Sequence, residues 1–172
     1  GQVIATGGLS DLAKESVTNI SAVVKKLTGK DIQDYDLHVQ FPGTHNVDGD
    51  SASITMATAI ISAFEGVPID QNLAMTGSLS VRGEVLPIGG VSAKIEAAVK
   101  SGIERVIIPR SNLQDVLIDE KYESMVEVLP VDSLDEVLQH ALVGAEEKVS
   151  LVERLANVID TISSGPDTQP SA

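Results

Sequence analysis

Residues 46 to 66 limit the fold more than any other stretch of the chain, because an acidic, glycine-containing turn runs directly into a helical segment that is apolar on almost every face. Apolar residues recur at helical spacing on one face and fill most of the others: Ile54, Ala57, Ala59, Ile60, Ile61, Ala63 and Phe64. A helix that is apolar nearly all round is a helix buried in a core. We therefore expect this segment to be a core element around which the rest of the chain packs.

Ser51 stands at the start of this helix and has two possible roles. Serine is one of the preferred N-cap residues, so the simplest interpretation is that it caps the helix. The alternative is a nucleophile, because the free N–H groups and the positive end of the dipole at a helix N-terminus stabilise negative charge. In that case the backbone N–H groups of Asp50 and Ser51 would bind the oxyanion that forms when the serine attacks a carbonyl group.

Lys94 lies in the first turn of a second predicted helix, at residues 91 to 101, directly after Gly89 and Gly90. A lysine is disfavoured there, because the N-terminal end of the helix dipole repels an ammonium group. The same repulsion, together with burial, lowers the pKa of a lysine and favours its neutral form. Most lysines in helices are solvated, and that is the plainer interpretation of Lys94. The alternative is a neutral amine, which can take the proton from a hydroxyl as a general base.

Three motifs in the sequence carry a resemblance to a known family. They are residues 48–53 (Asp-Gly-Asp-Ser-Ala-Ser), residues 76–90 (Thr-Gly-Ser-Leu-Ser-Val-Arg-Gly-Glu-Val-Leu-Pro-Ile-Gly-Gly) and residues 89–94 (Gly-Gly-Val-Ser-Ala-Lys). Their order and spacing resemble the proteolytic domain of the Lon proteases, specifically the archaeal, membrane-associated B-type branch, over residues 1 to 143. The resemblance implies an α+β fold of small mixed sheets packed with helices. It also implies that Ser51 and Lys94 form a catalytic dyad that cleaves peptide bonds through an acyl-enzyme.

The resemblance suggests roles for further residues around the dyad, each with a plainer alternative. Thr76 would orient Lys94 through its hydroxyl, or would simply favour a strand as a β-branched residue. Asp48 would help to hold Lys94 by limited contact, while Asp48 and Asp50 both place favourable negative charge at a helix N-terminus whatever their function. His38, on a predicted strand, would lie near the dyad without belonging to it, or would be a packing residue.

No metal site is predicted. Asp48 and Asp50 resemble the opening of a calcium-binding EF-hand loop, but Ser53 stands where that loop needs glycine and Ala59 where it needs a bidentate glutamate. The chain also has no Gly-x4-Gly-Lys-Ser/Thr phosphate-binding loop. We therefore expect no cofactor in this chain, and the resemblance implies that ATP and Mg²⁺ act in a separate ATPase domain.

The charge of the chain limits its partners. There are 12 lysine and arginine residues against 25 aspartate and glutamate residues, which gives a formal net charge of −13 at pH 7. Such an acidic chain argues against nucleic acid and against an anionic membrane surface as partners.

Cysteine is absent, which excludes thiol catalysis and disulfides. No apolar run approaches the roughly 20 residues of a membrane span, so we expect a soluble segment without membrane contact.

The rest of the sequence predicts alternating strands and helices. Strands are expected at residues 2–6, 37–41, 73–81, 85–86, 105–109 and 126–131, with residues 73–86 forming a β-hairpin. Helices are expected at residues 10–28, 91–101 and 133–142, with a short helical turn at residues 113–118. The protease domain is expected to end at residue 143. An amphipathic helix at residues 144–162 would dock on a neighbour, and the polar residues 163–172 would form a disordered tail.

The resemblance extends to the whole enzyme. Lon proteases are ATP-dependent endopeptidases that degrade unfolded, damaged and regulatory proteins, assemble as homo-hexamers and carry an AAA+ domain N-terminal to the protease domain. B-type members are anchored in the membrane, with the protease on the cytoplasmic side. The first strands of the protease domain are expected to be missing from this chain. Two alternatives remain open: a Lon-like scaffold without turnover, and an amidase or esterase that acts on small molecules.

Overall fold

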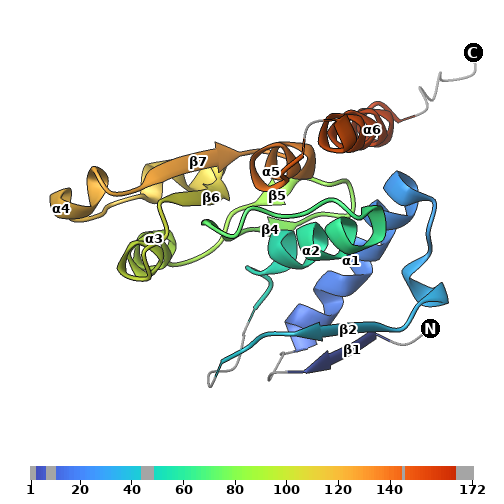
Figure 1. Ribbon diagram of the computed structural model, residues 1–172, viewed down its shortest axis with the longest axis horizontal. Helices are drawn as coiled ribbons and strands as arrows, with labels where there is room; N and C mark the ends of the chain where they lie inside the picture. Colours follow the sequence, from blue (N-terminus) through green and yellow to red (C-terminus); the bar gives the residue numbers. More distant parts are fainter. Residues whose placement is uncertain (1–2, 7–10, 44–48, 145, 166–172) are drawn as a thin grey trace, which may run out of the picture.

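The computed structural model describes residues 3–6, 11–43, 49–144 and 146–165. These residues form small β-sheets packed against helices, which confirms the predicted α+β fold (Figure 1). The helices are α1 (Asp11–Thr28), α2 (Ser53–Glu65), α3 (Val91–Lys100), α4 (Glu120–Glu123), α5 (Leu134–Ala141) and α6 (Glu146–Ser163), with 3₁₀ turns η1 (Ile32–Asp34) and η2 (Arg110–Asp115). The strands are β1 (Val3–Thr6), β2 (Leu37–Gln40), β3 (Leu73–Met75), β4 (Ser78–Leu79), β5 (Val85–Leu86), β6 (Arg105–Pro109) and β7 (Glu127–Val131).

Three small sheets are formed by the described residues. Strands β1 and β2 pair in parallel, and β4 and β5 form an antiparallel hairpin. The third sheet is parallel throughout, with β6 between β3 and β7. Strand β6 is buried over most of its length, as its continuous apolar sequence predicts for the central strand of a parallel sheet.

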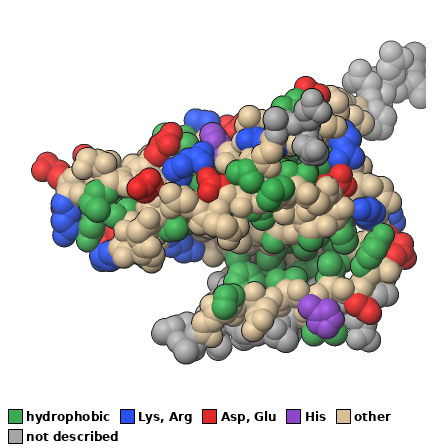
Figure 2. Space-filling model, in the orientation of Figure 1, with side chains coloured by type: hydrophobic (Ala, Val, Ile, Leu, Met, Phe, Trp, Pro, Cys, Tyr) green, Lys and Arg blue, Asp and Glu red, His purple; other side chains and the backbone are tan. Residues whose placement is uncertain are grey.

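Helix α2 lies in the core, as its apolar sequence predicts. It packs against α1 and α5 (Figure 1), and Ile54, Ala57 and Ile61 are fully buried. Its exposed positions are Ala59 and Ala63, so the helix is buried nearly all round. Figure 2 shows apolar side chains gathered between this layer and the ribbon formed by β1 and β2.

The expected strand at residues 73–81 is in fact two strands in different sheets. Strand β3 pairs with β6, whereas β4 pairs with β5. The chain leaves the first sheet at Gly77, because the Gly77 N–H donates to the Ser51 carbonyl (2.8 Å) and the Gly77 carbonyl accepts from the Ile54 N–H (3.2 Å). A Cβ atom at this position would lie 3.0 Å from Ile54 and from Val85, so glycine permits the close approach. The break brings the end of β3 directly against the turn that contains Ser51.

The short helical turn predicted at residues 113–118 is present but lies earlier in the chain. It is the 3₁₀ turn η2, which begins at Arg110 and ends at Asp115. The apolar residues Leu113 and Leu117 are exposed, whereas the polar residue Asn112 is buried. The turn is therefore held by polar contacts of its side chains rather than by an apolar stripe. The short helix α4 that follows has no buried residue, so it offered no periodic apolar pattern to predict it.

Helix α6 packs on its own chain through its apolar face, and docking on a neighbour stays a prediction. It lies against α5 and α1, and its apolar face contributes Leu151, Leu155 and Ile159 to the same buried cluster as α2. An ion pair between Arg154 of α6 and Glu65 of α2 (2.6 Å) adds a polar contact between the two elements. The predicted tail at residues 163–172 lies outside the described residues from 166 onward.

We predict that Gly83→Ala destabilises the fold through α6. Gly83, in the β4–β5 turn, has a φ angle of 88° and a Cβ there would lie 2.9 Å from the Ile159 side chain. The left-handed backbone costs an alanine about 1–2 kcal/mol, and overpacking adds about 1–3 kcal/mol. Gly66→Ala is the matched control, because Gly66 has a φ of 68° with open space around the missing Cβ. Urea unfolding should show the larger loss for Gly83→Ala, and equal losses would contradict the close contact with Ile159.

Candidate active site

Ser51 lies in a turn just before α2 rather than at its N-cap. The N-cap position is Ala52, which has no side-chain capping bond, and the helix begins at Ser53. The Ser53 hydroxyl donates to the Asp50 carbonyl (2.5 Å) and so closes the turn from within the helix, although this is not a capping bond. The capping interpretation is therefore wrong for Ser51, whose half-buried hydroxyl makes no hydrogen bond to another residue in the described ranges.

Thr76 connects the turn of Ser51 to Lys94. Its backbone N–H donates to the Ile107 carbonyl of β6 (3.1 Å), and its hydroxyl donates to the Ser51 carbonyl (3.3 Å). Lys94 Nζ in turn donates to the Thr76 hydroxyl oxygen (3.3 Å). Within the described part of the chain no hydrogen bond joins Ser51 Oγ directly to Lys94 Nζ. The structure thus brings the three predicted residues into one continuous arrangement with Thr76 in the middle.

Burial lowers the pKa of Lys94. The residue lies in the first turn of α3, where its N–H donates to the Gly90 carbonyl (3.2 Å), and its side chain is half-buried. Desolvation is the larger influence on the pKa of this amine, and the charge of Asp50 opposes it by favouring the protonated form. The net shift is downward, which is the direction that a general base requires.

Asp50 is held by a serine that the sequence did not single out. The Ser78 hydroxyl, which is buried, donates to Asp50 Oδ2 (2.6 Å). This bond fixes the carboxylate that acts on Lys94 without placing it in an ion pair with the lysine. Ser78 lies two residues after Thr76, and alternate residues of an extended segment share a side, so that spacing was the available signal. Asp48 lies outside the described residues, and its role stays a prediction.

The backbone before α2 has donors free for a bound group. The N–H groups of Asp50 and Ser51 donate to no acceptor among the residues that the structure describes. They lie in the turn that leads into a helix of 13 residues, where the dipole favours negative charge. Unused donors next to a candidate nucleophile are what an oxyanion site needs.

His38 does not reach this site through any contact described. It lies on β2, paired in register with Ile4 of β1, and its side chain is exposed. Its exposure also argues against the packing role that was its alternative. A role for His38 near the dyad stays a prediction.

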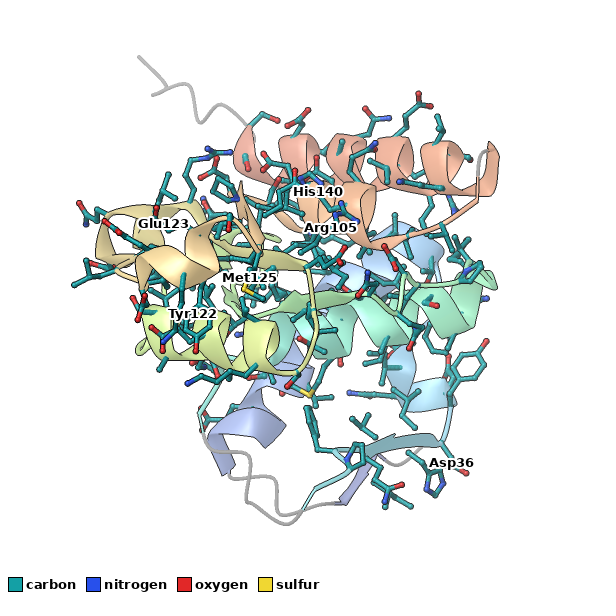
Figure 3. All side chains as sticks on the ribbon, turned by 60° about the vertical axis from the view of Figure 1, so that its left-hand side comes forward. Asp36, Arg105, Tyr122, Glu123, Met125 and His140 are labelled. Atoms are coloured by element: carbon teal, nitrogen blue, oxygen red, sulfur yellow. The ribbon has the colours of Figure 1, made fainter. Side chains whose placement is uncertain are left out.

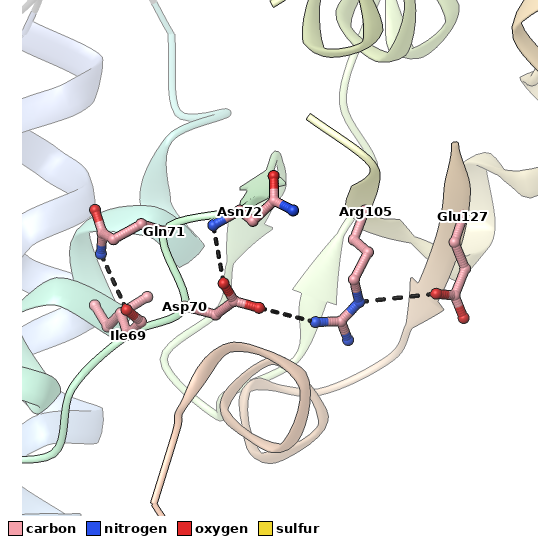
Figure 4. A network of polar contacts seen from close by, with 6 residues as sticks. All are labelled: Ile69, Asp70, Gln71, Asn72, Arg105 and Glu127. Carbon is pink, nitrogen blue, oxygen red and sulfur yellow. Dashed lines mark hydrogen bonds and ion pairs between the residues drawn. The ribbon is translucent and has the colours of Figure 1, made fainter. Parts of the chain in front are cut away.

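A cavity in the described part of the molecule lies away from these residues. It measures about 600 Å³ and is lined by residues from the C-terminal end of α3, the start of β6 and the segment before β7, among them Arg105, Met125 and Glu127 (Figure 3). Arg105 contacts Asp70 (3.2 Å) and Glu127 (3.7 Å), so it links the beginnings of the three parallel strands (Figure 4). Because Asp70 precedes β3 and Thr76 follows it, this network lies at the opposite end of the sheet from the candidate dyad. The network therefore joins the three strands of the sheet and takes no part in the candidate dyad.

Metal and membrane features are also not found in the described ranges. No group of three or more His, Asp or Glu side chains there is arranged to hold a metal ion. None of the described helices is both long and apolar enough to cross a membrane.

Comparison with known proteins gives the class to which this fold and site belong. A sequence model of protease domains matches residues 1–144, which makes the chain a proteolytic domain. The chain belongs to the Lon protease (S16) C-terminal proteolytic domain family. This finding confirms the resemblance derived from the motifs around Ser51, Thr76 and Lys94.

Individual relatives support the same assignment. An archaeal Lon protease of Methanothermobacter thermautotrophicus is 54% identical over 165 residues, covering 95% of this chain and 26% of that protein. The archaeal Lon protease of Archaeoglobus fulgidus is 56% identical over 155 residues, covering 90% and 25%. The bacterial Lon protease of Azorhizobium caulinodans is 37% identical over 162 residues, covering 90% and 19%. The chain thus spans about a quarter of the length of its archaeal relatives.

Proposed function

We propose that this proteolytic domain cleaves peptide bonds of unfolded or damaged proteins with Ser51 as nucleophile and Lys94 as general base. The observation that carries the proposal is the arrangement of Lys94, Thr76 and Ser51, together with the lowered pKa of the Lys94 amine. A serine hydroxyl is a weak nucleophile until a base removes its proton, and a lysine can act as that base only when it is neutral.

The hydrogen bonds of Thr76 set the direction of the lysine lone pair. The Ser51 carbonyl can only accept, so the Thr76 hydroxyl must use its proton there and receive an N–H from Lys94. A neutral amine has two N–H bonds and one lone pair, and an N–H committed to Thr76 leaves the lone pair for another partner. A small rotation would direct that lone pair to the Ser51 hydroxyl.

The reaction then follows as acyl transfer. Ser51 Oγ bonds to the carbonyl carbon of the scissile peptide while its proton passes to Lys94 Nζ. The N–H groups of Asp50 and Ser51 would hold the oxyanion, each donor contributing roughly 2.7–4 kcal/mol in comparable sites. Lys94 gives the proton to the leaving amine as the C–N bond breaks. Neutral Lys94 then takes a proton from a water molecule that attacks the ester carbonyl, and it returns that proton to Ser51 Oγ as the ester C–O bond breaks.

We further propose that the energy for substrate unfolding comes from outside this chain. ATP and Mg²⁺ would act on an AAA+ domain of the same protein, because the chain itself has no phosphate-binding loop. The assembly would be a homo-hexamer, with the protease domain on the cytoplasmic side and the membrane anchor in the ATPase part. The family membership and the relatives' greater length support these proposals.

Ser51→Ala in the full-length protein tests the nucleophile. We expect cleavage of a fluorescently labelled unfolded protein to fall to background, because the other hydroxyl beside Lys94, that of Thr76, donates its proton to the Ser51 carbonyl. A fluorophosphonate should label the wild type and not the variant, and Ser111→Ala, at an exposed serine, should behave as the wild type. An ester substrate run in parallel separates peptide cleavage from simple ester hydrolysis. Cleavage that persists in a well-folded Ser51→Ala protein would sink the proposal.

A further inference from the structure

Asn112 is a buried polar residue outside the dyad, and it binds the loop that leads to Lys94. Only 4% of it is exposed. Its Oδ1 accepts from the Ile88 N–H (2.8 Å) and its Nδ2 donates to the Ile88 carbonyl (2.9 Å), so the side-chain amide pairs with the backbone as a neighbouring strand would. A further bond from Nδ2 to Asp115 Oδ2 (3.0 Å) holds the amide in that orientation.

The loop that Asn112 binds is held by apolar packing and by hydrogen bonds. Ile88 and Val91 pack in one apolar cluster on either side of Gly89 and Gly90. A Cβ atom at either glycine would find no atom within 4 Å, so the glycines add no packing of their own. Gly90 is the N-cap of α3, has a φ of 71° and makes no side-chain capping bond. Its carbonyl accepts the N–H of Lys94 (3.2 Å), so the polar contacts that fix the start of α3 are made just upstream.

A second contact joins α3 to the same segment. The Ser92 hydroxyl donates to the Asp115 carbonyl (3.1 Å) and accepts from the Leu117 N–H (2.8 Å). Asn112 holds the loop before the helix and Ser92 holds its first turn. Together they attach the beginning of α3 to η2 at two points.

The segment that holds Lys94 also holds Thr76. Turn η2 follows β6 without a break, and the Ile107 carbonyl of β6 accepts the Thr76 N–H (3.1 Å). The continuous stretch formed by β6 and η2 therefore positions both partners of the Lys94–Thr76 hydrogen bond. A displacement of Asn112 relative to β6 would change the distance between them.

We propose that Asn112 is a positioning residue for the general base, which sets the place of Lys94 relative to Thr76 and Ser51 through the backbone of Ile88. The inference rests on the proposed dyad. It predicts that the loss of the Asn112 amide lowers turnover more than it lowers binding, because the substrate itself does not contact the buried amide. A misplacement of about 1 Å at a reacting group costs on the order of 10²-fold in rate.

Asn112→Asp in the full-length protein is the sharpest test. Aspartate has nearly the same size and can still accept from the Ile88 N–H, but it has no donor for the Ile88 carbonyl and sets a carboxylate against Asp115. We expect kcat for an unfolded protein substrate to fall by about 10²-fold, with KM little changed. We also expect the rise of kcat with pH to move to higher pH, since a displaced Lys94 is better solvated; Asp50 is the charged group that faces it among the described residues. Gln114→Ala, at an exposed position of η2, is the matched control.

Two outcomes would overturn the inference. A variant with a lower melting temperature but wild-type kcat and pH dependence would show that Asn112 only stabilises the fold. If Asn112→Asp does not fold, the Ser92→Ala variant tests the inference instead. It removes the second attachment of α3 to η2 and should lower kcat in the same way. An unchanged kcat in Ser92→Ala would refute the inference. A failure of the proposed dyad gives a different result from a failure of this inference. If the dyad is wrong, the Lys94→Met variant keeps its activity.

Discussion

Lys94→Met is expected to reduce peptide cleavage to background while the protein stays folded. Methionine fills similar space without a basic group, so the Ser51 hydroxyl would keep its proton. Lys94→Arg should be equally inactive, because an arginine side chain does not lose its proton in proteins. Cleavage of a labelled unfolded protein and the melting temperature of the full-length variants provide the measurement. Substantial turnover in either variant would show that another group acts as the base.

The pH dependence of the wild type follows from the same residue. Only the neutral amine can accept the Ser51 proton, so kcat/KM should rise as the pH increases through the pKa of Lys94. At an unperturbed pKa of about 10.4, the neutral form at pH 7 would cost about 4.6 kcal/mol. Burial removes part of that cost because it lowers the pKa of Lys94.

A change at Asp50 tests in which direction the pKa of Lys94 moves the activity profile. Its charge favours the protonated lysine, so Asp50→Asn should lower the pKa of Lys94 further and move the activity profile to lower pH. The asparagine oxygen can still accept from Ser78, which keeps the turn in place. A profile that moves to higher pH, or that does not move, would contradict the assignment of the rising limb to Lys94.

The sequence suggested candidate residues for the dyad but not the contacts that hold them. Ser51 and Lys94 were singled out by the motifs that resemble the Lon family, since a serine before a helix or a lysine in a first turn says little by itself. The break at Gly77 was missed, because the residues on both sides favour strand and only a contact with the distant Ser51 turn separates them. The wider lesson is that local patterns report local preferences, whereas a change of sheet is decided by tertiary contacts.

Buried polar residues were the hardest to predict. Ser78 and Asn112 are residue types that usually face solvent, and each is buried only because a partner far away in sequence satisfies its hydrogen bonds. The spacing of Ser78 from Thr76 was a weak local signal, whereas nothing in the immediate neighbourhood of Asn112 distinguishes it from exposed residues such as Gln114. Helix α6 shows the reverse case, because its apolar periodicity alone predicted the helix and the face that is buried.

Helix α6 completes the hydrophobic core although it lies beyond the residues matched by the family model. That match ends at residue 144, whereas Leu151 and Leu155 of α6 are at most 1% exposed. They pack in the cluster that includes α2, whose N-terminal turn carries Ser51. The stability of this helix is therefore coupled to the element on which the proposed nucleophile depends.

Leu155→Ala is expected to destabilise the domain by about 2–5 kcal/mol, the usual cost of a cavity left by a fully buried leucine. Val149→Ala is the matched control on the same helix, because Val149 is 51% exposed and its truncation leaves no cavity. Urea unfolding of the two variants measures the difference. Because α6 packs on α5 and α1, which flank α2, the loss should also make the Ser51 turn more accessible to hydrogen exchange. Equal stability of the two variants would mean that α6 is not docked in solution as it is in the structure, and the domain would then need another cover for its apolar core.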